Sequence, residues 1–166
     1  MMLTDEPTAD ITTTINGKKV TARVVLRQSL VDWVRHEVGL TGSHVGCEHG
    51  VCGACHVVVD GKVVRGCLML AVQADGASIV TIDAPEASKE AGALQTAFYE
   101  RAALQCGFCT PGMILQASEL LQENSAPSRS EIRDAISGNY CRCTGYHAIV
   151  DAIEAAAAAL RAEKAA

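Results

Sequence analysis

Two hydrophobic patterns divide the chain. From residue 11 to about 84, apolar residues alternate with polar ones in short runs, as in β-strands with one buried face. Asn16-Gly17 and Asp60-Gly61 interrupt these runs, and both dipeptides are typical of β-hairpin turns. From about residue 93 onward, apolar residues recur at helical spacing. The pattern predicts a β-rich half followed by an all-α half.

Residues that start helices refine this prediction. Ser29, with Asp32 three positions later, predicts one short helix within the β-rich half. In the second half, Thr110 is expected to cap a helix whose first residue is Pro111. Three more helices are expected there, marked by Leu94, Ala97, Phe98 and Leu104, by a capping box of Ser128 and Glu131, and by the apolar positions from about Tyr146 to Ile153.

These elements predict an α+β protein of two domains without an internal repeat. Residues 1–10 are polar, contain a proline and are expected to form a flexible arm. The β-rich domain covers 11–84, and the small, polar residues of 85–92 are expected to form a linker. The helical domain covers 93–166 and ends in an alanine-rich tail.

Composition narrows the class of protein. Of the 166 residues, 49% are hydrophobic, which is enough for a packed core. The net charge of -5 argues against a nucleic-acid partner, because phosphate binding needs a basic surface. The chain has no apolar run long enough to span a membrane, and its acidic start lacks the features of a secretory signal. A cytoplasmic protein is therefore expected.

The chain contains eight cysteines. Reducing conditions in the cytoplasm disfavour structural disulfides, so metal or cluster binding is the better explanation for so many thiols.

The first cysteine set has the spacing of a plant-type [2Fe–2S] site. Cys47, Cys52 and Cys55 are separated by four and then two residues, and Cys67 follows after the predicted hairpin turn. Glycines among them would let the loop turn backbone N–H groups toward sulfur, and these are Gly46, Gly50 and Gly53.

Two features of this set admit other interpretations. Residues 52–56 also match the c-type haem attachment pattern, but haem would leave Cys47 and Cys67 unexplained. His49, in Cys47-Glu48-His49, resembles a Rieske ligand, yet no matching Cys-x-x-His follows. We expect His49 and His56 to face solvent or to support the ligands.

The second cysteine set consists of Cys106 and Cys109, followed by Cys141 and Cys143. Each pair precedes a predicted helix, whose free N–H groups are expected to lower the pKa of a nearby thiol. Taken alone, the first pair would also suit a redox dithiol, and all four thiols would suit a structural zinc ion.

Three segments together support a resemblance to a known family. Residues 47–55, 105–112 and 138–146 closely resemble the small iron–sulfur subunit of the molybdenum hydroxylase family. The resemblance extends from Ile11 to about Ile153. Its departures are His56, Tyr140 and His147, none of which removes a cysteine.

The resemblance implies a fold and two cofactors. The expected fold is a ferredoxin-like β-grasp domain followed by an all-α four-helix bundle of pseudo-twofold character. Each domain would hold one [2Fe–2S] cluster. The implied iron ligands are Cys47, Cys52, Cys55 and Cys67 for one cluster and Cys106, Cys109, Cys141 and Cys143 for the other.

The resemblance also implies partners. A large subunit would carry the molybdenum–pterin cofactor and a medium subunit FAD, arranged as a dimer of heterotrimers. Gln105 is expected to hydrogen-bond the pterin, with Cys143 on the same side, although Gln105 also suits capping of a carbonyl at a helix end.

The implied function is electron transfer from molybdenum through both clusters to FAD. No catalytic constellation or phosphate-binding loop is found in the chain itself. The competing classes are a free-standing two-cluster ferredoxin and a zinc-stabilised adaptor. The substrate stays open among carbon monoxide, aldehydes, aromatic heterocycles and acyl-CoA thioesters.

Overall fold

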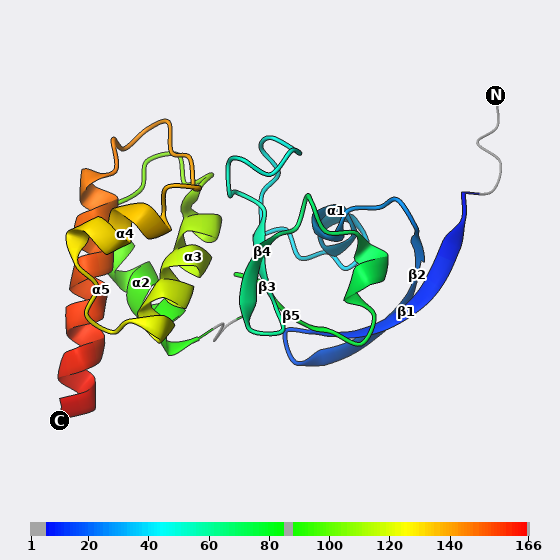
Figure 1. Ribbon diagram of the computed structural model, residues 1–166, viewed down its shortest axis with the longest axis horizontal. Helices are drawn as coiled ribbons and strands as arrows, with labels where there is room; N and C mark the ends of the chain where they lie inside the picture. Colours follow the sequence, from blue (N-terminus) through cyan, green and yellow to red (C-terminus); the bar gives the residue numbers. More distant parts are fainter. Residues whose placement is uncertain (1–5, 85–87, 166) are drawn as a thin grey trace.

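A sheet-containing half and a helical half lie side by side in the computed structural model (Figure 1). The structure describes residues 6–84 and 88–165. The α+β class and the order of its two halves are therefore as predicted.

A five-stranded mixed sheet forms the first half, in the order β2-β1-β5-β3-β4. Strand β5 runs parallel to β1, whereas the other neighbours are antiparallel. The turn residues Asn16, Gly17, Asp60 and Gly61 all have positive φ angles, which confirms both predicted hairpin turns. The strands are β1 (Thr8–Ile15), β2 (Lys18–Val25), β3 (His56–Val59), β4 (Lys62–Arg65) and β5 (Ser78–Val80).

Helix α1 (Leu30–His36) and the short 3₁₀ helix η1 (Ala71–Ala74) complete this half. The Ser29 side chain accepts a hydrogen bond from the Asp32 N–H, which confirms the predicted cap. Trp33 is fully buried, and α1 packs with it into a core shared with the sheet. Apolar residues from both elements and the sheet form this core, including Ile11, Ile15, Val24, Leu30, Val34, Val57 and Ile79.

The described residues of the second half contain α2 (Lys89–Glu100), α3 (Thr110–Glu123), α4 (Arg129–Ala135) and α5 (His147–Ala165). One apolar core unites these four helices, and Phe98, Met113, Ile132 and Ile153 are fully buried in it. Ser128 and Glu131 form the predicted capping box at the start of α4.

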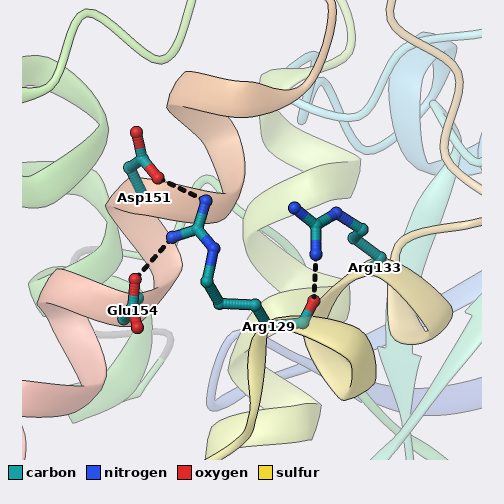
Figure 2. A network of polar contacts seen from close by, with 4 residues as sticks. All are labelled: Arg129, Arg133, Asp151 and Glu154. Atoms are coloured by element: carbon teal, nitrogen blue, oxygen red, sulfur yellow. Dashed lines mark hydrogen bonds and ion pairs between the residues drawn. The ribbon is translucent and has the colours of Figure 1, made fainter.

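Polar contacts tie α4 to α5 at the surface (Figure 2). The Arg129 guanidinium donates to Asp151 at 2.7 Å and to Glu154 at 2.6 Å, and Arg133 donates to the Arg129 carbonyl. Because these groups are solvent-exposed, they orient the short helix more than they stabilise it.

Several predicted boundaries differ from the structure. Strand β1 begins at Thr8, so residues 8–10 belong to the sheet and not to an arm; the Asp10–Arg23 ion pair and the β2 pairing hold them there. Residues 1–5 of the predicted arm and 85–87 of the predicted linker lie outside the described residues. The helical half begins earlier than residue 93, because Ser88 caps α2 at Lys89.

Two predicted helix ends also shift. Leu104 lies outside α2, which ends at Glu100, and is 38% exposed. Thr110 is the first residue of α3, and Cys109 takes the N-cap position. Neither side chain makes a capping hydrogen bond, and the Thr110 hydroxyl oxygen is buried without a partner in the structure.

Helix α3 packs against β3 and β4 and joins the two halves. The Glu119 carboxylate accepts the Val63 N–H at 2.9 Å, which satisfies a backbone donor on the edge strand β4. At the other end of α3, a Cβ added to Gly112 would lie 2.1 Å from the Gly53 carbonyl oxygen. The two backbones therefore touch where the cysteine segments meet. Of the described helices, none has the length and apolar character needed to cross a membrane.

Candidate metal centres

The first four cysteines come together at one end of the sheet. Cys47, Cys52 and Cys55 lie on the loop between α1 and β3, and Cys67 follows β4. The β3–β4 hairpin returns Cys67 to the loop as predicted, since His56 pairs with Arg65 and the Gly66 N–H donates to the Cys55 carbonyl at 3.1 Å.

Backbone N–H groups surround Cys47. Burial opposes ionisation of this thiol, but N–H donors of His49, Cys52 and Val51, with the Cys52 thiol, outweigh it and lower the Cys47 pKa to about 6. The loop reaches this shape through positive φ angles at Glu48, Gly50 and Gly53, so the predicted nest of N–H groups is present.

Cys55 is the opposite case. Burial, with the Cys67 and Cys52 thiols nearby, raises the Cys55 pKa to about 12. The Cys55 thiol lies near enough to Cys67 to affect its pKa, and the Cys47 thiol lies near Cys52 in the same way. The first site therefore consists of two pairs of neighbouring thiols.

The second four cysteines come together in the helical half, between the start of α3 and the loop before α5. Cys106 and Cys109 precede α3, and Cys141 and Cys143 lie on the loop before α5. The Cys106 and Cys143 sulfurs are 3.5 Å apart, and the Cys109 thiol lies near enough to Cys141 to affect its pKa. Here too the thiols form two neighbouring pairs, each joining one segment to the other.

The loop of Cys141 is held by neighbouring hydroxyl groups. Thr144 donates to the Cys141 sulfur at 3.1 Å, and the Tyr146 hydroxyl accepts the Cys141 N–H at 2.8 Å. Burial opposes ionisation of Cys141, but the Thr144 hydroxyl and the N–H groups of Cys143 and Thr144 lower its pKa overall.

The prediction that a helix start lowers the thiol pKa is wrong for Cys109. Although Cys109 is the N-cap of α3, burial, with the Cys141 and Cys106 thiols nearby, raises its pKa to about 12. The Phe108 N–H does lower the pKa of exposed Cys106, with help from the Cys143 thiol. Burial thus outweighs the helix end for the inner thiol of the pair.

The paired sulfurs suit a [2Fe–2S] cluster, in which each of two irons takes two thiolates. Four ligands around one zinc would instead converge on a single point. Within residues 6–84 and 88–165, no three His, Cys, Asp or Glu side chains are gathered around such a point. The donor set and the N–H groups aimed at Cys47 and Cys141 fit an anionic cluster at each site.

The thiol pKa values predict selective alkylation of the metal-free chain. At pH 7 the Cys47 thiol is about nine-tenths ionised and should react rapidly with iodoacetamide, whereas Cys55 and Cys109 stay protonated. Peptide mass spectrometry should show Cys47 labelling slow as the pH falls from 7 through 6, because protonation removes the nucleophile. The denatured chain, in which all thiols are equivalent, is the control. Equal native labelling of Cys47 and Cys55 would contradict the prediction.

The histidines near the sites differ in environment. His49 is exposed, in agreement with the expectation that it faces solvent. His56 is only 2% exposed, and burial lowers its pKa. Its Nδ1 lies 3.3 Å from the Gly112 carbonyl oxygen and 3.4 Å from the Asn139 Nδ2. His56 therefore lies between the two halves and does not face solvent.

Two residues near the sites were missed by sequence reasoning. His44 stacks on Phe108, with ring centroids 4.7 Å apart, and its Nδ1 lies 2.8 Å from the Phe108 carbonyl oxygen. Asn139 is 2% exposed and donates to the Gly53 carbonyl. Both residues connect the cysteine loops of different halves. In the sequence, the only signal for Asn139 is that it is a polar residue within 138–146 to which no other role was assigned.

Gln105 lies on the exposed side of the second site, together with Cys106 and Cys143. Its Nε2 donates to the Cys143 carbonyl oxygen at 3.0 Å. The side chain is therefore held beside Cys143 by a contact of the carbonyl-capping kind, which is the alternative to the implied pterin contact.

Comparison with known proteins assigns both halves. Residues 13–84 match the model of a 2Fe-2S iron-sulfur cluster binding domain, and residues 81–154 match that of a [2Fe-2S] binding domain. Each match contains four of the eight cysteines.

Similar proteins match over most of the chain. The gamma subunit of caffeine dehydrogenase from Pseudomonas sp. (strain CBB1) is 51% identical over 147 residues, covering 87% of this chain and 88% of the relative. The nicotine 6-hydroxylase small subunit of Paenarthrobacter nicotinovorans is 48% identical over 155 residues, 92% and 93% of the two chains.

A solved structure has the same fold. In quinoline 2-oxidoreductase from Pseudomonas putida 86, a chain with 50% identity superposes with a TM-score of 0.87, covering 93% of this chain and 97% of that one. The chain belongs to the small [2Fe–2S] iron–sulfur subunits of the molybdenum hydroxylase family, which serve as electron-transfer subunits of oxidoreductase complexes.

Proposed function

We propose that this chain passes single electrons from a molybdenum–pterin centre in a large partner subunit to FAD in a medium one. The observation that carries the proposal is the gathering of eight free cysteines into two sites of paired thiols. When bound, each [2Fe–2S] cluster supplies a centre that takes up and releases one electron at a time. Two such centres allow the two electrons released by one substrate oxidation to be passed on one at a time.

The proposed ligands follow the two sites. Cys106, Cys109, Cys141 and Cys143 would hold the cluster that receives electrons, and Cys47, Cys52, Cys55 and Cys67 the one that passes them on. Their N–H neighbours offset the negative charge of the clusters. We propose a ferredoxin-like β-grasp domain for residues 8–84 and a four-helix bundle for 88–165, as the strand order and the shared helical core support.

The exposed face of the second site supports a partner subunit there. Cys106 and Cys143 are exposed, and so are three apolar side chains within a few residues of these cysteines in the sequence, Leu104 (38%), Phe108 (47%) and Tyr140 (58%). Exposed apolar surface of this kind is typical of a protein interface. We propose that the large subunit covers this face and that Gln105 reaches the pterin there.

The medium subunit is proposed to cover the first site, where Val51 and Leu68 are exposed. We further propose a dimer of heterotrimers in the cytoplasm, where reducing conditions keep cysteines available as iron ligands. The relatives named for caffeine, nicotine and quinoline support an aromatic nitrogen heterocycle as the substrate of the complex.

Affinity purification of the tagged chain from its native host tests the assembly. Two further subunits carrying molybdenum–pterin and FAD are expected to co-purify in equal amounts. A stable holoprotein without partners would instead favour the free-standing ferredoxin.

The role of Gln105 predicts a specific defect. Gln105→Ala is expected to slow reduction of the second cluster by substrate in the assembled complex, because the side chain no longer orients the pterin contact or the Cys143 carbonyl. Stopped-flow absorbance measures this reduction, and exposed Gln95→Ala on α2 is the matched control. If Gln105→Ala leaves cofactor retention and internal electron transfer unaltered, the proposed pterin contact is without function.

A further inference from the structure

The two cysteine sites are joined by one backbone hydrogen bond. The Tyr140 N–H donates to the Cys52 carbonyl oxygen at 2.9 Å. Cys52 belongs to the first site, and Tyr140 directly precedes Cys141 of the second. A single hydrogen bond therefore completes a short chain of bonds between a sulfur of one site and a sulfur of the other.

Asn139 fixes the segment that donates this bond. Its side chain is buried and donates to the Gly53 carbonyl at 3.4 Å, next to Cys52. Its own carbonyl accepts the Tyr146 hydroxyl at 3.2 Å, and this hydroxyl in turn accepts the Cys141 N–H at 2.8 Å. Asn139 is thus attached to the first site through its side chain and to the second through its backbone.

His56 supports the same contact from the sheet side. It follows Cys55 at the start of β3, is 2% exposed, and brings Nδ1 within 3.3 Å of the Gly112 carbonyl oxygen on α3. The same nitrogen lies 3.4 Å from the Asn139 Nδ2. His56 therefore contacts both segments of the helical half that face the first site.

The backbones in this region leave no space for side chains between them. A Cβ on Gly53 would lie 2.7 Å from both the Gly138 carbonyl oxygen and the Asn139 Nδ2. Close backbone contact of this kind leaves little free space in which the hydrogen-bonded segments could move apart.

We propose that Asn139 and His56 are positioning residues that hold the Cys52 carbonyl against the Tyr140 N–H, and that electrons cross between the two sites through this hydrogen bond. The proposal rests on the proposed function, since it requires a cluster at each site. With [2Fe–2S] clusters bound, the step would carry one electron from the group held at the second site, which would be oxidised, to the group held at the first, which would be reduced. No covalent bond forms or breaks, and no proton moves.

Asn139→Ala in the assembled complex tests the proposal. A laser pulse excites a flavin that takes an electron from an amine donor and passes it to the clusters. Freeze-quench EPR then follows this electron from the second-site signal to the first-site signal. The variant is expected to keep both signals and both reduction potentials and to lose the fast phase of intercluster transfer. Amide hydrogen exchange at Tyr140 should quicken in parallel. Ser137→Ala, at an exposed position of the same loop, is the control.

The outcomes separate this proposal from the proposed function. Wild-type transfer in Asn139→Ala with both clusters present would overturn the proposal and leave the proposed function standing. If that variant does not assemble, His56→Leu gives the same test, and wild-type transfer there overturns the proposal equally. A wild-type chain without clusters would overturn both.

Discussion

Cys109→Ser is expected to abolish one of the two reduced-state EPR signals and about half of the bound iron, and to leave the other signal intact. Cys109, at the start of α3, lies near Cys141 and is one of the four proposed ligands of the second cluster. Serine removes one thiolate from the second site without touching the first, which lies in the other half.

Cys55→Ser is the reciprocal variant. Cys55 is the buried thiol of the first site, and its replacement should remove the other EPR signal. Loss of both signals in either variant, or of neither, would contradict two separate sites of four cysteines each.

Gly112→Ala is expected to separate the two halves. A Cβ at this position would lie 2.1 Å from the Gly53 carbonyl oxygen, and backbone cannot yield as a flexible side chain would. Overpacking of this kind costs about 1–3 kcal/mol. A lower midpoint of thermal unfolding should therefore be accompanied by faster amide exchange at Tyr140, whose hydrogen bond lies at the same contact.

Gly92→Ala is the matched control on α2. A Cβ there meets nothing within 4 Å, so the change should stabilise the chain by about 0.5–1 kcal/mol through helix propensity. A Gly112→Ala protein as stable as the wild type would show that the halves do not dock through this contact.

Local features of the fold could be predicted from the sequence because they depend on neighbouring residues. The Asn16-Gly17 turn and the Ser128 capping box are specified within a few positions. The cysteine spacing likewise divides the thiols into two sets from local sequence alone, and the hairpin brings Cys67 back to the loop of Cys55.

Features that depend on tertiary packing could not be predicted in the same way. The Tyr140–Cys52 hydrogen bond joins distant segments, and nothing local to either residue indicates it. The same is true of the buried place of His56 between the halves. The Cys109 pKa was predicted in the wrong direction, because a helix start can be read from Pro111 whereas burial of the thiol cannot.

Iron and acid-labile sulfide analysis of the purified chain tests the central claim most directly. Two [2Fe–2S] clusters held by eight cysteines predict about four irons and about four sulfides per chain. Zinc without labile sulfide would contradict the claim.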